Sequence, residues 1–327
     1  MKKVVVIGGG TGNFMVLSGL KKYPFDLTAV VSMTDNGGST GVLRDELGVL
    51  PPGDIRQCLV ALATSEKVLR ELFNYRFEEG SLIGHSFGNL FITSLEKITG
   101  SFEDAVMEAG KVLAIKGRVL PVTCQETTLC VDLGDKTIVR GQIQVDGVGI
   151  YKYPNKKLFL EPEVMVNPKV KKVISEADLI VISPGSLYSS LLPNFLPQGM
   201  KSAIKGTGAK IVYVGNLVNK PDETAGYELR DYVSEIENCM GRKIDYVLYN
   251  SKKPQGKLLN RYANANELLI RIGKGINGKI IKADLLSEVS SSDERLNKSP
   301  FVIRKNTLIR HDPNKVASEL KKMLATL

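Results

Sequence analysis

The sequence lacks tryptophan, and aromatic residues make up only 6% of its 327 residues. An aromatic surface for stacking nucleic-acid bases is therefore not expected. The four cysteines form no C-x-x-C pair, which argues against zinc ribbons and redox motifs and suits a reducing cytosol. No apolar run approaches the roughly 18 residues of a membrane span. The apolar run at the N-terminus is too short for a signal peptide, so we interpret it as a first strand.

Long basic blocks are also missing, although 44 Lys and Arg against 35 Asp and Glu give a net charge of +9. The densest basic clusters are Lys169 to Lys172 and Lys252-Lys253. An ordinary lysine-rich surface explains this charge, and so does attraction of an anionic ligand. Nucleic acid is not an expected partner.

Recognisable catalytic arrangements are absent. There is no G-x-S-x-G elbow, no Walker A lysine and no H-E-x-x-H, and no local pattern supports a Cys–His pair. The sequence alone leaves open whether the protein is an enzyme.

The most informative segment that is present is an apolar run, 4–7, followed by Gly8-Gly9-Gly10-Thr11-Gly12 and a helical pattern. A strand, a glycine-rich turn and a helix in this order direct backbone N–H groups and a positive helix end towards one spot, which attracts phosphate. Gly8 and Gly10 fit the first two glycines of G-x-G-x-x-G, but Asn13 replaces the third. The segment indicates a nucleotide or phosphorylated ligand, and the missing glycine argues against a dinucleotide-dependent oxidoreductase.

The wider pattern predicts an α/β fold, a Rossmann-like doubly wound domain over 1–327 with a mainly parallel sheet. A change of pattern predicts a β-rich insertion or sheet extension at about 117–161, including a hairpin that turns at Gly134-Asp135. The expected strands are 3–7, 27–33, 177–182, 210–214 and 244–248; the expected helices are 12–22, 55–64, 67–77, 89–98, 102–113, 224–240 and one from 314; a second hairpin is expected at 301–309.

Two polar segments near the start of the chain are expected beside the first glycine cluster. Asp35-Asn36-Gly37-Gly38-Ser39 follows the second strand, and parallel strands place such loops at one edge. In Pro52-Gly53-Asp54-Ile55-Arg56, Asp54 either only caps the next helix, or Asp54 or Asp35 holds a divalent metal that neutralises phosphate. Arg56 would then lie one turn into the helix, where it could bind phosphate oxygens.

Four later segments are further candidates. His85 is one of only two histidines, and it is either structural or faces the ligand together with Ser86 and Asn89. Ser183-Pro184-Gly185-Ser186 repeats the order of strand, turn and helix, so Ser186 either caps a helix or binds phosphate. Gly215-Asn216 follows another strand, and Arg310-His311-Asp312 is a polar cluster near the end.

This series of motifs resembles the family of bacterial gluconeogenesis factors and the related 2-phospho-L-lactate transferases, over nearly the whole chain. The Arg310-His311-Asp312 cluster is similar to the gluconeogenesis-factor branch in particular. That branch implies a cytoplasmic protein that binds a UDP-sugar such as UDP-N-acetylglucosamine and supports cell shape and wall synthesis on gluconeogenic carbon sources. The transferase branch implies Mg²⁺-dependent transfer of phospholactate to a deazaflavin.

The resemblance also implies that Asn216 and Arg310 belong to a UDP-sugar pocket and, for the transferase branch, that Asp54 holds the metal. The sequence leaves the metal requirement and homo-oligomer formation open. The ligand-binding residues expected from the motifs and the resemblance together are Gly9, Gly10, Thr11, Gly12, Asp35, Asn36, Gly37, Gly38, Ser39, Asp54, Arg56, His85, Asn89, Gly185, Ser186, Asn216 and Arg310.

The sequence departs from the family pattern near this pocket. The family usually reads Asn-x-Met-Thr-Gln-Pro-Gly-Glu-Thr where this chain has Asn216-Leu217-Val218-Asn219-Lys220-Pro221-Asp222-Glu223-Thr224. A following Asp-His is Asp231-Tyr232, and Gly-Pro-Gly-Ser is Ser183 to Ser186. These differences affect the expected identity of the ligand and leave the expected fold unchanged.

Overall fold

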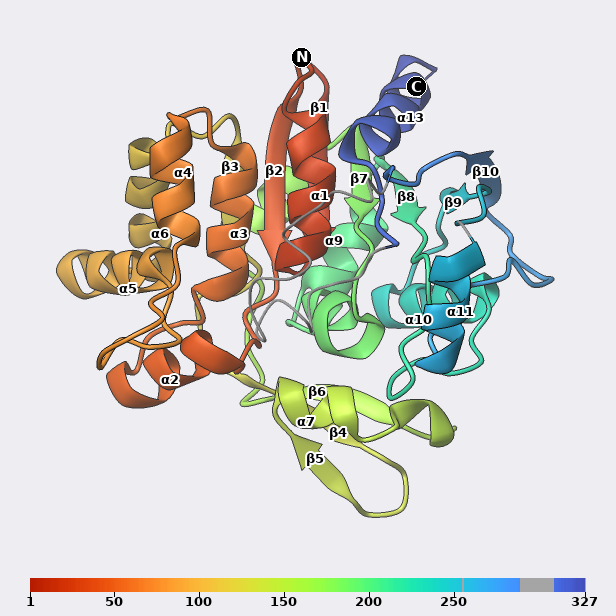
Figure 1. Cartoon of the computed structure of the whole chain (residues 1–327), viewed down its shortest axis with the longest axis horizontal. Helices are drawn as coiled ribbons and strands as arrows, with labels where there is room; N and C mark the ends of the chain where they lie inside the picture. Colours follow the sequence, from red (N-terminus) through yellow and green to blue (C-terminus); the bar gives the residue numbers. More distant parts are fainter. Residues whose placement is uncertain (255, 289–308, 327) are drawn as a thin grey trace.

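The computed structural model describes residues 1–254, 256–288 and 309–326. Within them, a seven-stranded parallel sheet forms the centre of the protein (Figure 1). Its strands are β1 (Lys3–Gly8), β2 (Asp26–Val31), β3 (Arg118–Pro121), β7 (Leu179–Ile182), β8 (Lys210–Val214), β9 (Tyr246–Asn250) and β10 (Lys279–Ala283). They lie in the order β10-β9-β8-β7-β1-β2-β3, which confirms the predicted Rossmann-like doubly wound fold.

The central strands are buried on both faces, as their continuous apolar sequences predict. In β1 every residue after Lys3 is buried, and all four residues of β7 are buried. β1 pairs in register with β2 from Lys3↔Asp26 to Gly8↔Val31, and with β7 from Val4↔Leu179 to Ile7↔Ile182. The strand order therefore reverses direction between β1 and β7, and ligands of open α/β sheets bind at such a switch point.

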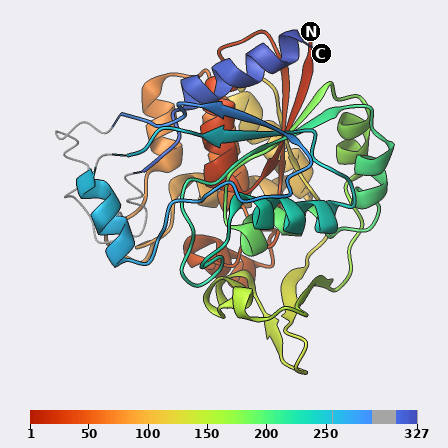
Figure 2. The ribbon, with the colours of Figure 1, turned by 90° about the vertical axis from the view of Figure 1, so that its right-hand side faces the viewer.

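Helices cover both faces of the sheet. On one face α1 packs between α3 and α13, and on the other α9 lies between α8 and α10 (Figures 1 and 2). Across the described part of the chain, no helix combines the length and apolar character needed to cross a membrane. The helices are α1 (Gly10–Leu20), α2 (Gly38–Leu47), α3 (Gly53–Leu62), α4 (Lys67–Asn74), α5 (Phe87–Thr99), α6 (Phe102–Val112), α7 (Gln142–Gly147), α8 (Pro168–Ser175), α9 (Met200–Gly206), α10 (Leu229–Met240), α11 (Gly256–Asn264) and α13 (Pro313–Ala325), with the short turns η1 (Ile150–Lys152), η2 (Leu187–Leu191) and η3 (Leu192–Phe195).

A small antiparallel sheet lies beyond the carboxyl edge of the main sheet (Figure 1). It consists of β4 (Thr128–Asp132), β5 (Ile138–Arg140) and β6 (Lys157–Glu161) in the order β5-β4-β6. The predicted hairpin is confirmed, because β4 and β5 pair from Cys130↔Arg140 to Asp132↔Ile138. Both alternatives for this range occur, because the strand β3 at its start pairs with β2 and extends the main sheet, while β4, β5 and β6 form the separate small sheet.

Several predicted boundaries were wrong. The expectation that Asp54 caps α3 is contradicted, because Pro52 is the N-cap and Asp54 is the second helical residue. The helix α2 begins at Gly38, inside a segment interpreted as a loop. The helix expected from residue 224 begins only at Leu229, where Glu228 and Asp231 form a capping box. The hairpin expected at 301–309 lies almost entirely outside the described residues.

Candidate functional site

The loops that follow β1 and β7 touch each other at the switch point. A Cβ atom added to Gly12 would lie 1.8 Å from the carbonyl oxygen of Pro184. A Cβ atom added to Gly8 would lie 2.1 Å from Ser183 Oγ. Glycine is therefore required at position 12, where the neighbour is backbone, and a side chain at position 8 would have to displace the Ser183 hydroxyl. This contact joins the first predicted glycine cluster to the Ser183–Ser186 segment.

The first turn of α3 lies against the same glycine cluster. The Asp54 carboxylate is 2.5 Å from the position of a Cβ atom on Gly10, and the Thr11 hydroxyl donates to Gln57 Oε1 over 3.1 Å. One Asp35 oxygen accepts from Gly37 N over 2.9 Å. The other is 3.0 Å from the position of a Cβ atom on Gly53, the residue before Asp54. Both predicted acidic residues therefore lie close to Gly53, one in space and the other as its neighbour in sequence.

A polar cluster joins α2, α3 and α5. The hydroxyl of Ser39 accepts from Asn89 Nδ2 over 3.2 Å and lies 3.1 Å from His85 Nδ1. Arg56, only 7% exposed, donates from Nε to Asn89 Oδ1 over 2.9 Å and from Nη1 to Asn74 Oδ1 over 2.7 Å. Burial lowers the pKa of Arg56 to about 10, and repulsion from Arg76 acts in the same direction. Arg56 thus ties α3 to α4 and α5, while phosphate binding by Arg56 stays a prediction.

Asn216, after β8, holds the loop after β7. Its Nδ2 donates to the Gly185 carbonyl over 2.7 Å, and its Oδ1 accepts from Gly185 N over 3.1 Å. The Tyr213 hydroxyl donates to the same Oδ1 over 3.1 Å. A single amide side chain therefore fixes both backbone groups of Gly185, one of the predicted ligand residues.

The predicted C-terminal cluster returns to the end of β8. His311 is buried and is hydrogen-bonded to the Gly215 backbone. Burial lowers its pKa to about 4, although the bond to Gly215 acts in the opposite direction. Arg310 is exposed, and its carbonyl accepts from Ser287 N over 2.9 Å. Asp312 caps α13 by accepting from Asn314 N and Lys315 N.

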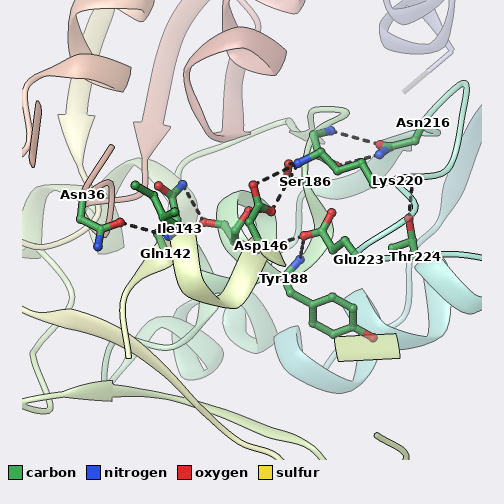
Figure 3. A network of polar contacts seen from close by, with 12 residues as sticks. Asn36, Gln142, Ile143, Asp146, Ser186, Tyr188, Asn216, Lys220, Glu223 and Thr224 are labelled. Carbon is green, nitrogen blue, oxygen red and sulfur yellow. Dashed lines mark hydrogen bonds and ion pairs between the residues drawn. The ribbon is translucent and has the colours of Figure 1, made fainter. Parts of the chain in front are cut away.

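The helix α7, between β5 and β6 of the small sheet, contacts the loops of the main sheet (Figure 3). The Asn36 amide oxygen accepts from Ile143 N over 3.1 Å, and Gln142 Nε2 donates to the Ser189 carbonyl over 3.2 Å. The Ser189 hydroxyl also donates to Asp146 over 2.7 Å. The helix therefore bridges the loop after β2 and the segment after β7.

Lys220 completes this bridge. Its ammonium group lies 3.2 Å from Asp146 Oδ2 and donates to the Ser186 hydroxyl (Figure 3). Ser186 is the N-cap of η2, but its side chain makes no capping hydrogen bond. The predicted site set omitted Lys220 and Asp146, and the only sequence signal for Lys220 was its departure from the family pattern.

Glu223 is a buried acid beneath this network. It is 1% exposed, and one carboxylate oxygen accepts from Tyr188 N over 2.8 Å and from Ser189 N over 3.3 Å. Burial raises the pKa of Glu223 to about 7, and the nearby Lys220 ammonium offsets only part of this effect. Glu223 therefore holds the segment after β7 through the backbone N–H groups of Tyr188 and Ser189.

A cavity of about 640 Å³ opens beside Asn216 at the ends of β8 and β9. Its polar lining includes Lys252, Lys253 and Arg271, and its aromatic lining consists of Tyr227, Tyr249 and Tyr262. This volume is in the usual range for small-molecule sites.

The predicted ligand residues from Gly9 to Asn216 all lie near one edge of the sheet. They follow the carboxyl ends of β1, β2, β7 and β8 or lie at the starts of α3 and α5. The structure links them into three groups, one around Gly10 and Asp54, one around Ser39 and Asn89, and one around Gly185 and Asn216. In residues 1–254, 256–288 and 309–326, no three His, Cys, Asp or Glu side chains are grouped closely enough to hold a metal ion.

Comparison with known proteins gives relatives along the whole chain. The family model described as 2-phospho-L-lactate transferase CofD matches residues 4–286. A Bacillus subtilis protein named gluconeogenesis factor is 38% identical over 325 residues, which cover 98% of each chain. A gluconeogenesis factor of Listeria innocua is 36% identical over 332 residues, covering 98% of this chain and 95% of the relative. A crystal structure of a upf0052 family member from Bacillus halodurans has a TM-score of 0.87 at 35% identity, and the match covers 98% of this chain and 99% of that one.

Proposed function

Since this chain belongs to the CofD family and matches gluconeogenesis factors along nearly its full length, we propose that it is a cytoplasmic gluconeogenesis factor that binds a UDP-sugar. The ligand that we propose is UDP-N-acetylglucosamine or a close analogue. The binding would support cell shape and wall synthesis on gluconeogenic carbon sources, as the resemblance to the family implies.

The observation that carries this proposal is the meeting of the loops after β1 and β7 at the switch point, next to Asn216, which also lines the cavity at the ends of β8 and β9. The close contact of Gly12 with Pro184 leaves backbone groups of two loops at the carboxyl edge, where phosphates bind in open α/β sheets. Asn216 is hydrogen-bonded to Gly185 in the loop after β7 and also lines the cavity. A nucleotide sugar has a diphosphate, which suits the loops, and bulkier groups at its ends, which suit the cavity. The net charge of +9 favours such an anion.

Calorimetric titration of the full chain with UDP-N-acetylglucosamine tests this function. We expect saturable binding of UDP-N-acetylglucosamine and competition by UDP. Uridine alone should bind more weakly. Absence of binding at millimolar ligand, with the protein folded by circular dichroism, would overturn the proposal.

A second candidate function is Mg²⁺-dependent transfer of phospholactate to a deazaflavin, and the placement of Asp35 and Asp54 favours it. Their carboxylates lie beside Gly53 and Gly10 at the glycine loops. Mg²⁺ takes one or two carboxylates and fills its other positions with water and substrate phosphates, so this donor set fits the ion. Asp54 and Asp35 would hold the metal, which would neutralise phosphate charge. Turnover of a deazaflavin acceptor with Mg²⁺ would support this function, and a host without deazaflavin biosynthesis would exclude it.

A further inference from the structure

Lys220 is the starting point, because its ammonium group lies beside the loop after β7 at the proposed site. The Lys220 ammonium contacts the hydroxyl of Ser186, in the loop after β7 that meets Gly12. Its side chain is 47% exposed, so solvent and solutes reach it.

The partner of Lys220 comes from a different part of the fold. Asp146 lies on α7, and its two oxygens are 3.3 Å and 3.2 Å from Lys220 Nζ. Asp146 is 38% exposed, and exposed ion pairs of this kind contribute little to stability. The ion pair is therefore a contact that a stronger anion can replace at low cost.

We propose that Lys220 binds the diphosphate group of the ligand and that this group displaces Asp146, so that ligand binding loosens α7 from the main sheet. The inference rests on the proposed function for the identity of the ligand. A lysine ammonium is a compact charge on a flexible stem, so it can turn from Asp146 to an anion beside Ser186 without backbone movement. A diphosphate offers more negative charge and more acceptor oxygens than one carboxylate.

The remaining contacts of α7 explain why the helix would loosen and not detach. Asn36 still accepts from Ile143 N, and Gln142 still donates to the Ser189 carbonyl. Asp146 would also keep its bond from the Ser189 hydroxyl. Because binding equilibria are reciprocal, the docking of α7 must weaken anion binding by the same factor by which the anion weakens docking.

The test uses inorganic pyrophosphate as the probe, with the full chain, and measures both affinity and hydrogen exchange of residues 142–147. We expect pyrophosphate to increase exchange in this segment of the wild-type protein. Lys220→Gln should weaken pyrophosphate binding about tenfold or more, because it removes a charge-assisted contact, and it should abolish the increase in exchange. Lys220→Arg should retain most of both effects.

Asp146→Asn should tighten pyrophosphate binding severalfold, since Lys220 then has no competing carboxylate. Lys210→Gln is the matched control at the opposite end of β8. Lys210 Nζ lies 3.1 Å from Asp245, and the Lys210 side chain is 46% exposed. The Lys220–Asp146 pair has nearly the same distance, 3.2 Å, and the Lys220 side chain nearly the same exposure, 47%. The control should leave pyrophosphate binding unchanged.

Pyrophosphate that binds equally well to wild type, Lys220→Gln and Lys210→Gln would overturn the inference, as would absence of binding to all of them. Reduced exchange in residues 142–147 on binding would also overturn it. Lys220-dependent pyrophosphate binding without any binding of UDP-N-acetylglucosamine would support this inference and reject the UDP-sugar function, so the two failures are distinguishable.

Discussion

Asn216 and Gly185 exchange two hydrogen bonds across the gap between β8 and β7, one in each direction. The same pairing normally joins two backbones, but here a side-chain amide takes the place of one strand. Asn216 therefore fixes the backbone of Gly185 in the loop after β7 from both sides of the residue.

We expect Asn216→Ala to lower the free energy of unfolding by about 1–3 kcal/mol, because two hydrogen bonds are lost and Gly185 N–H loses its acceptor. Urea denaturation measures this change. Asn216→Asp keeps the acceptor for Gly185 N but loses the donor to its carbonyl, so it should give an intermediate loss together with weaker anion binding. Wild-type stability in Asn216→Ala would show that the loop is held by other contacts.

Gly12→Ala should destabilise the protein by about 3 kcal/mol, since its methyl group would overlap the Pro184 carbonyl oxygen. Thermal unfolding followed by circular dichroism measures the loss. The control is Gly206→Ala at the end of α9, where an added Cβ atom meets nothing within 4 Å. The control should change stability by less than about 1 kcal/mol. Equal melting temperatures for the two variants would contradict the close approach of the two loops.

Arg310→Ala should weaken UDP-N-acetylglucosamine binding about tenfold or more, because a charge-assisted hydrogen bond is worth about 1.5–3 kcal/mol. The melting temperature should barely change, since the Arg310 side chain is exposed. Arg140→Ala, an exposed arginine on β5, is the control and should bind as the wild type does. An Arg310→Ala variant with wild-type affinity would remove Arg310 from the ligand site.

Glu223 and His311 should make opposite contributions to the pH dependence of stability. Folding raises the pKa of Glu223 from 4.5 to about 7, so its stabilising contribution is complete below pH 4.5 and is lost as pH rises to about 7. Folding lowers the pKa of His311 from 6.5 to about 4, so its contribution is complete above pH 6.5 and is lost as pH falls to about 4. The two slopes largely cancel between pH 4.5 and 6.5.

Single variants should separate these slopes in urea titrations from pH 4.5 to 6.5. In Glu223→Gln the free energy of unfolding should rise with pH relative to wild type, by up to about 1.4 kcal/mol per unit, because the opposing acid is gone. In His311→Gln it should fall with pH relative to wild type. If either variant runs parallel to wild type, that group does not titrate with a shifted pKa.

The parts of the fold that could be predicted were those with a local signal. The run Val4 to Gly12 predicted a strand, a turn and a helix, and the structure has β1, Gly9 and α1 there. The start of α3 could not be predicted from its composition, because Asp54 is a common capping residue. Gly53 takes the first helical position instead, where a Cβ atom would lie 2.4 Å from Thr40 Oγ1 on the neighbouring helix.

The network around Lys220 could not be predicted because its contacts are distant in sequence. Asp146 and Lys220 are 74 positions apart, and nothing near either residue points to the other. The docking of α7 decides this pairing, and the position of α7 depends on the tertiary packing of the small sheet. The UDP-sugar site itself stays a prediction, although its loops meet where the strand order reverses.

The contact between α1 and α13 also bears on how the protein is made. A Cβ atom on Gly19 in α1 would lie 2.0 Å from the carbonyl oxygen of Pro313, so the first helix is fitted closely to the last. During synthesis α1 leaves the ribosome long before residue 313 is translated. One face of α1 must therefore lack its native neighbour until α13 has been translated, and chains that terminate before α13 would present this face to chaperones and proteases.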